Sequence, residues 1–236
     1  TPQQERNVSF SKDGKTLVYA SERENSWDIY MAEIDKETPY FYNAIEFKET
    51  AIVKDKRENF QPKFSPDGKK IAYLANRTEV RAYDLDSKKN WSVLDGGLNY
   101  SYSDGDQYFE WAPDSKWLLV HFYAYDRWNE DIGLINISGK EKPINLSNSG
   151  YSNYQPKFAM DGEMVYWATD RHGYRSHGSW GAYADVHAIF LTVDAYNKYK
   201  MSKSDYAFWK EQEKEAKKKA KKDDDKDKDK NKDKED

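Results

Sequence analysis

At 236 residues the chain is long enough for one large all-β domain or two small ones, and its 8 Trp, 19 Tyr and 10 Phe supply an aromatic core despite a hydrophobic content of only 37%. The absence of cysteine excludes disulfides, thiolate zinc sites and a cysteine nucleophile. The formal net charge is −4; residues 210–236, with 12 Lys and 11 acidic residues, carry +1, so the remaining chain carries −5. This balance argues against a nucleic acid or an anionic membrane as partner.

Four copies of one pattern follow one another along the chain. They read NVSFSKDGKTLVYAS, QPKFSPDGKKIAYLA, YFEWAPDSKWLLVHF and QPKFAMDGEMVYWAT, at residues 7–21, 61–75, 108–122 and 155–169. Each copy consists of an aromatic strand end, a tight turn and an apolar strand, which is typical of a β-hairpin.

An acidic residue marks the turn of every copy. These residues are Asp13, Asp67, Asp114 and Asp161, spaced by 54, 47 and 47 residues. Pro66 and Pro113 suit the second position of a type I turn, and the following Asp can accept hydrogen bonds from nearby backbone N–H groups. Ser115 replaces the Gly of the other copies, which predicts an altered turn or a small strain cost. Because a catalytic group is needed once and a turn in every unit, we interpret Ser65, Asp67 and Lys69 as structural.

Each hairpin is followed by further strand candidates. Third strands are predicted at residues 27–34, 79–85, 130–137 and 184–193, and fourth strands at residues 90–96 and 142–148. Four short strands in each unit of roughly 40 to 50 residues are typical of a β-propeller blade. A β-sandwich would not show such long-period copying. The predicted fold is therefore all-β, a propeller of four-stranded blades in which the four units are part of a larger propeller.

The predicted domain organisation has three parts. The propeller region covers residues 1–200, with units at about 7–60, 61–106, 107–154 and 155–193. A short helix follows at 201–222, favoured by Glu–Lys pairs four residues apart, and residues 223–236 are expected to form a disordered Lys/Asp linker.

The loop at residues 170–181 is the strongest candidate for a contact site, because long loops with Arg, His and aromatic residues tend to carry binding residues. The candidates for peptide or domain contact are Arg171, His172, Tyr174, Arg175, His177 and Trp180. The alternative is that this loop packs over a blade edge or against a neighbouring domain. Two further stretches, 35–59 and 123–131, also combine aromatic residues with charge.

No catalytic, metal or cofactor motif is recognisable. The nearest approach to a G-x-S-x-G nucleophile elbow, at residues 177–181, has His in place of the first Gly. Phosphate-binding loops are absent, and the spacing of His172, His177 and His187 matches no zinc motif. We therefore expect no catalytic residue, no metal and no cofactor in this chain.

The repeats resemble the WD-like propeller repeats shared by TolB and the tricorn protease, over residues 7–193. Residues 169–215 are similar to the amino-terminal propeller of bacterial tricorn-like serine peptidases. This resemblance implies a noncatalytic propeller portion of a serine peptidase, which guides or gates peptides or docks other domains of the same protein. A cytoplasmic location is a further implication of the resemblance, with the periplasm as the alternative compartment. Separately, end blades without a neighbour would expose apolar surface, which predicts association into a homo-oligomer. The alternative functions are a TolB-like protein-binding scaffold without a protease and the propeller cap of a prolyl-oligopeptidase-type enzyme.

Overall fold

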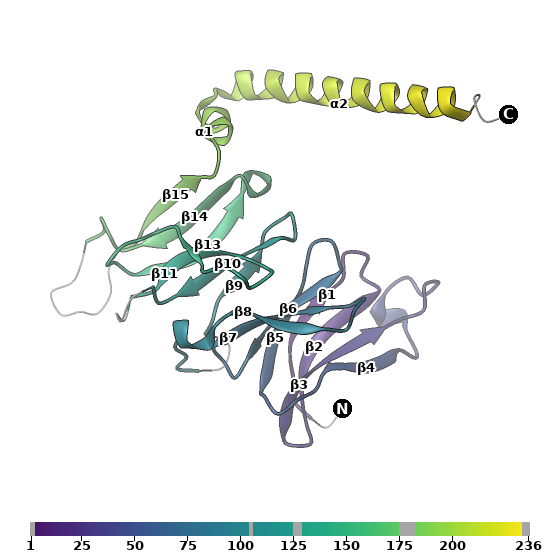
Figure 1. Ribbon diagram of the computed structural model, residues 1–236, viewed down its shortest axis with the longest axis vertical. Helices are drawn as coiled ribbons and strands as arrows, with labels where there is room; N and C mark the ends of the chain where they lie inside the picture. Colours follow the sequence, from purple (N-terminus) through teal and green to yellow (C-terminus); the bar gives the residue numbers. More distant parts are fainter. Residues whose placement is uncertain (1–2, 104–105, 125–128, 175–182, 233–236) are drawn as a thin grey trace. The chain divides into compact units, whose positions relative to one another are not determined.

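The computed structural model describes residues 3–103, 106–124, 129–174 and 183–232 (Figure 1). The chain divides into two compact units, Thr1–Ile189 and Phe190–Asp236. Over the described residues, the first unit contains four antiparallel sheets and the second contains two helices.

The four sheets follow one another along the chain. The first consists of β1 (Glu5–Phe10), β2 (Thr16–Arg23), β3 (Ser26–Glu33) and β4 (Lys48–Val53). The second consists of β5 (Asn59–Phe64), β6 (Lys70–Ala75), β7 (Glu79–Asp84) and β8 (Asn90–Leu94). The third consists of β9 (Phe109–Trp111), β10 (Trp117–Phe122), β11 (Asp131–Asn136) and β12 (Ile144–Asn145). The fourth, over its described residues, consists of β13 (Asn153–Ala159), β14 (Met164–Thr169) and β15 (Asp185–Phe190).

Each sheet is a meander whose spatial order follows the chain, as β1-β2-β3-β4 in the first and β5-β6-β7-β8 in the second. This is the topology of a propeller blade, and it confirms the predicted fold class. The fourth blade differs from the prediction, because its described part has three strands. We refer to the sheets as blades 1 to 4.

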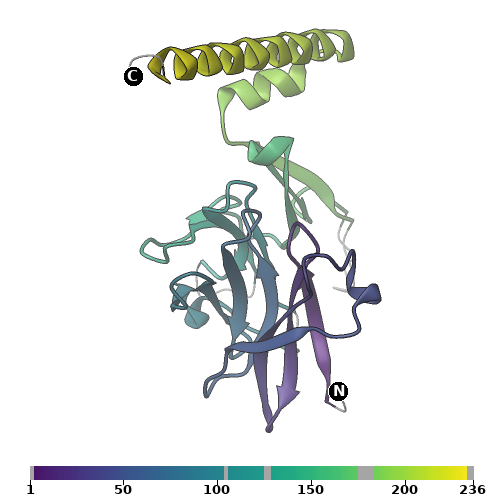
Figure 2. The same cartoon turned by 90° about the vertical axis from the view of Figure 1, so that its right-hand side faces the viewer.

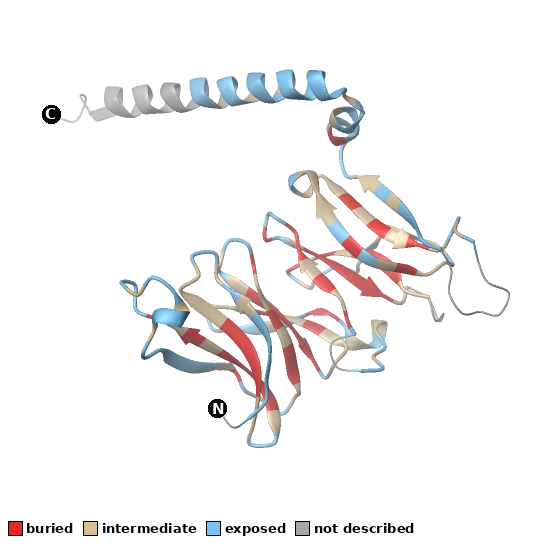
Figure 3. Cartoon of the chain, turned by 180° about the vertical axis from the view of Figure 1, so that it is seen from behind, coloured by how far each residue is buried: buried red, intermediate tan, exposed pale blue. Residues whose placement is uncertain are grey.

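The second strands of blades 1 to 3 are buried on both faces, because β6 and β10 lie between neighbouring blades and the stretch between β3 and β4 packs on the outer face of β2. In β2, Val18 belongs to the main core cluster, which also holds Ile71 of β6 and Leu118 of β10. Its neighbour Tyr19 points to the opposite face and belongs to a separate cluster. The buried residues accordingly follow the middle strands of the blades (Figure 3). The continuous apolar runs in the sequence are therefore the signature of two-sided burial.

The repeated turns share one geometry in blades 1 to 3. Gly14 and Gly68 have φ of 69° and 71°, and Ser115 adopts the same left-handed conformation with φ of 60°. In blade 4 the turn differs, since Met160 and Asp161 both have positive φ and form a 3-10 turn, η3 (Met160–Gly162). Met160 stands where blades 2 and 3 have proline, and only a residue other than proline can adopt positive φ there.

The stretch between β3 and β4 crosses one face of blade 1. It contains the 3-10 turn η1 (Phe41–Asn43). A further 3-10 turn, η2 (Gly96–Leu98), follows β8 in blade 2. Because β4 is a regular fourth strand, the irregular part of the insertion predicted at 35–59 is limited to residues 35–47 and 54–58. Figure 2 shows this stretch against the first blade.

The second unit is more helical than the sequence predicted. Helix α1 (Val193–Lys200) lies in a stretch assigned to the propeller, and its N-cap Thr192 accepts a hydrogen bond from Ala195 N at 3.0 Å. Helix α2 (Lys203–Lys232) continues ten residues past the predicted end at 222, into the expected disordered linker. The extra turns contain neither proline nor glycine, so nothing in them breaks a helix. Within the described ranges, neither helix is long and apolar enough to span a membrane.

Candidate peptide-contact site

The described ends of the predicted contact loop pack locally. The Arg171 guanidinium lies 5.9 Å from the centre of the Tyr151 ring, and the His172 ring lies 5.3 Å from that of His187. Tyr183 N donates a hydrogen bond to Tyr174 O at 2.9 Å, which closes the base of the loop. The side chain of Tyr174 stays exposed.

The remaining predicted contact residues, Arg175, His177 and Trp180, lie outside the described residues. The structure therefore brings Arg171, His172 and Tyr174 to one edge of blade 4 without testing the rest of the loop. Among the residues that are described, no group of three or more His, Asp or Glu side chains is placed to hold a metal ion.

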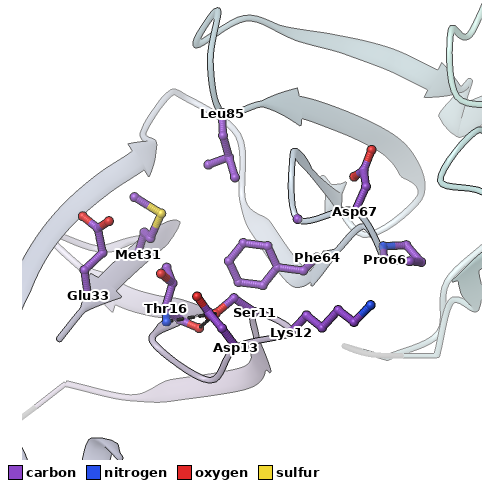
Figure 4. Close-up of a pocket in the computed structure, with 11 residues that line it drawn as sticks. Ser11, Lys12, Asp13, Thr16, Met31, Glu33, Phe64, Pro66, Asp67 and Leu85 are labelled. Carbon is purple, nitrogen blue, oxygen red and sulfur yellow. Dashed lines mark hydrogen bonds between the residues drawn. The ribbon is translucent and has the colours of Figure 1, made fainter. Parts of the chain in front are cut away.

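A groove of about 680 Å³ lies between the turns of blades 1 and 2 (Figure 4). Its volume falls in the range of small-molecule and peptide-side-chain sites. The floor is apolar and is formed by Met31 from β3, Phe64 from β5 and Leu85, which directly follows β7. All three are partly buried and pack against the main core cluster. The floor is thus a continuation of the core that reaches the surface.

The two turns on the rim hold their carboxylates by the same pattern of bonds. Asp13 Oδ1 accepts from Ser11 Oγ at 2.7 Å and from Lys15 N at 3.1 Å. In blade 2, the equivalent Asp67 Oδ1 accepts from Ser65 Oγ at 2.6 Å and from Lys69 N at 3.0 Å.

These bonds favour the ionised form of both carboxylates. The hydrogen bond from Ser11 Oγ, supported by that from Lys15 N, lowers the pKa of Asp13 below its ordinary value. Partial burial raises the pKa of Asp67, but the hydrogen bonds from Ser65 Oγ and Lys69 N outweigh it, and the net shift is downward. With Glu33 also on the rim and Lys12 opposite, the groove carries three carboxylates and one ammonium group.

A second set of charges links the first strands of neighbouring blades. Lys63, Glu110 and Lys157 occupy equivalent positions, one residue before the aromatic strand end. Lys157 Nζ lies 3.4 Å from Glu110 Oε2, and Lys63 Nζ donates to Phe109 O at 2.7 Å. Burial lowers the pKa of Lys63. Because these groups are engaged between blades, they stabilise the blade contacts and are less suited to a ligand than the groove.

Sequence reasoning identified the turn residues of the groove but assigned them a structural role alone. It did not predict that Met31, Glu33 and Leu85 would join them around a cavity. The sequence carries one signal, an apolar residue near the end of the third strand or just after it in blades 1 and 2, which is Met31 or Leu85. Such a pattern does not distinguish an open groove from ordinary core.

Comparison with known proteins places these features in context. No family model matches the chain. It is 36% identical over 111 residues to a protein of Sulfurisphaera tokodaii named as a tricorn-like protease C-terminal subunit, and 32% identical over 124 residues to a tricorn protease homolog of Saccharolobus solfataricus. The alignments cover 47% and 52% of this chain, but only 12% and 11% of the relatives. The chain thus matches about an eighth of each relative's length.

Solved structures agree on the fold. A crystal structure of the tricorn protease matches with a TM-score of 0.57 at 13% identity, over 80% of this chain and 18% of that one. TolB from Acinetobacter baumannii matches with a TM-score of 0.53 at 17% identity, over 81% of this chain and 44% of that one.

The repeated meander blades and these likenesses define the class of the first unit as a β-propeller. Its blades resemble those of the tricorn protease and TolB structures in fold, and part of its sequence is similar to the two tricorn-named relatives.

Proposed function

We propose that this chain is the noncatalytic propeller portion of a tricorn-like serine peptidase, and that it contacts peptide substrates or docks other domains of that protein. The observation that carries the proposal is the sequence similarity, at 36% and 32% identity, to two relatives named for the tricorn protease. The groove between blades 1 and 2 supplies a surface of suitable size for peptide side chains.

One histidine–carboxylate pair among the described side chains invites comparison with a catalytic triad. His121 Nδ1 lies 3.2 Å from Glu130 Oε2, which is a histidine–carboxylate pair of the kind found in catalytic triads. However, His121 is buried, and its Nε2 has no hydrogen-bond partner in the described part of the chain. A triad requires a nucleophilic hydroxyl at that nitrogen.

Two measurements test the proposal. The purified chain should hydrolyse no peptide and should not react with a fluorophosphonate probe for activated serines. The reading frame that encodes the chain should also encode a serine peptidase domain. Labelling of any serine in this chain would contradict the noncatalytic role, and a reading frame without a peptidase would contradict the link to a protease.

The TolB-like alternative, a protein-binding scaffold without a protease, is supported by the fold alone, since the TolB match is at 17% identity. It predicts the same lack of hydrolysis, so the reading frame separates it from the first proposal.

A further inference from the structure

We propose that the groove between blades 1 and 2 binds an extended peptide segment in which a Lys or Arg side chain lies next to a large apolar side chain. The proposal rests on the proposed peptide contact and specifies the chemistry of the peptide. It involves binding only and no covalent step.

The apolar half of the preference comes from the floor. The Phe64 ring points toward the Met31 and Leu85 side chains (Figure 4). A leucine or phenylalanine side chain of a ligand would cover these partly exposed groups and remove apolar surface from water. A polar side chain would gain nothing there, because all three floor side chains are apolar and offer it no strong hydrogen-bonding group.

The cationic half comes from the rim. Asp13 and Asp67 use Oδ1 for their turn bonds, and a carboxylate has a second oxygen with acceptor capacity to spare. Glu33 adds a third carboxylate on the side of Met31, while the Lys12 side chain extends along the rim away from Phe64 (Figure 4). The charge of Lys15 acts on Asp13 and those of Lys69 and Lys70 act on Asp67, but none of these three lysines lines the groove. The lining itself carries three carboxylates and one ammonium group, so it favours a cationic ligand over an anionic one.

The charge of the rim should persist at mildly acidic pH. Hydrogen bonds hold the pKa of Asp13 and of Asp67 below the ordinary value, so both stay ionised well below neutrality, and no histidine lines the groove. Binding should therefore change little between about pH 8 and about pH 6. It should weaken with added salt, since the rim is open to solvent.

Three fluorescein-labelled hexapeptides with blocked ends test the preference. The first, Ala-Leu-Lys-Phe-Arg-Ala, carries both features. The second replaces Lys and Arg by Glu, and the third replaces Leu and Phe by Ser. Fluorescence anisotropy with the 236-residue chain should give the tightest binding for the first peptide.

Two charge variants at the rim locate the site. Glu33→Lys should weaken binding of the first peptide by about fivefold, and Lys12→Glu should strengthen it by about threefold, as is typical of solvent-exposed ion pairs. The matched controls are Glu141→Lys and Lys140→Glu, which make the same charge changes on exposed residues that do not line the groove. Circular dichroism of each variant checks that it folds.

The proposal is supported if the two rim variants change affinity in opposite directions and the two controls change it much less. Equal binding of all three peptides, or control effects as large as the rim effects, would overturn the groove proposal while leaving peptide contact elsewhere on the chain in place. If none of the peptides binds, the groove proposal fails together with the peptide-contacting part of the proposed function.

Discussion

At the scale of single residues, Ser115 shows how one repeat departs from the others. It stands where the other turns have glycine and adopts a left-handed backbone, with φ of 60°. Its Oγ accepts a hydrogen bond from Asp67 N of the preceding blade at 3.0 Å. The side chain thus offsets the backbone strain by a bond that glycine could not form.

Substitutions at this position should separate the two effects. Ser115→Ala keeps the strain and loses the bond, whereas Ser115→Gly loses the bond but relieves the strain. Each effect is worth about 1 kcal/mol, so the alanine variant should be the less stable of the two by about 1 kcal/mol in urea unfolding.

Gly14→Ala is the matched control for the backbone effect, because Gly14 has φ of 69° and a Cβ added there would meet nothing within 4 Å. It should cost about 1 kcal/mol. Equal stability of the two Ser115 variants would contradict the assignment of strain to this turn.

The sequence predicted the strain at Ser115 but not its compensation. The strain could be predicted because the conformation of the turn depends on neighbouring residues only, and the missing glycine can be seen by comparing the repeats. The hydrogen bond joins two residues that are 48 positions apart in the chain and lie in different blades. No local sequence pattern shows that these two residues approach each other.

At the scale of elements, the stretch between β3 and β4 covers the face of blade 1 on which no blade packs in the described part of the chain. Phe41, like Leu17, packs against the buried cluster of Tyr19, Tyr30 and Ala32, and it contacts the Phe10 ring edge-on at 5.7 Å. Lys15 Nζ from the blade 1 turn donates to Thr38 O and to Pro39 O. This stretch therefore acts as an end cap for the blade.

Truncation of the cap should be measurable. Phe41→Ala should destabilise the protein by roughly 1–2 kcal/mol, because the side chain is only partly buried and fully buried phenylalanines cost more. Tyr42→Ala is the matched control, since Tyr42 is 82% exposed and its loss should change stability by no more than about 0.5 kcal/mol. Similar effects of the two substitutions in chemical unfolding would contradict the capping role.

Sequence reasoning treated the same stretch as one of several aromatic rims and could not predict that it folds back. Its aromatic residues mark it as unusual, but aromatic residues are frequent throughout the chain. The stretch packs on blade 1 because no blade in the described part of the chain covers Leu17 and Tyr19. This depends on the order of the blades in space, which a local sequence pattern does not show.

At the scale of the whole first unit, the blades are joined unequally. One core cluster runs through blades 1, 2 and 3, whereas blades 3 and 4 share a smaller cluster of Leu119, Ile132, Val165 and Trp167. The third strand of blade 4, β15, has no fully buried residue. Blade 4 is thus the least supported of the four in the described structure.

Native-state hydrogen exchange should reflect this difference. In repeat proteins, stability is carried by each unit and its contacts with neighbours, so weakly joined units open first. Backbone amides of β14 should exchange roughly tenfold faster than those of β6, or more, in low concentrations of urea. Equal protection of the two strands, measured by mass spectrometry, would show that the unit opens as a single cooperative block.

The class of fold was predictable because the information is repeated four times, whereas each functional surface occurs once. The repeat also hides exceptions, such as the three described strands of blade 4 and the helix at Val193–Lys200, which lies in a stretch that had been assigned to the propeller region. The groove could not be predicted from the repeat, because it occurs once and depends on Glu33 and Leu85 in two different blades.

Contacts at or next to the repeated turns also fix the order of the blades. Ser9 Oγ accepts from Phe64 N at 3.2 Å between blades 1 and 2, Ser115 receives Asp67 N between blades 2 and 3, and a Cβ on Gly162 would come within 3.1 Å of the Pro113 ring between blades 3 and 4. Each junction therefore has its own pair of partners. Despite their common sequence pattern the blades are not equivalent, and a chain with its blades in another order would leave the backbone N–H groups of Phe64 and Asp67 without these acceptors.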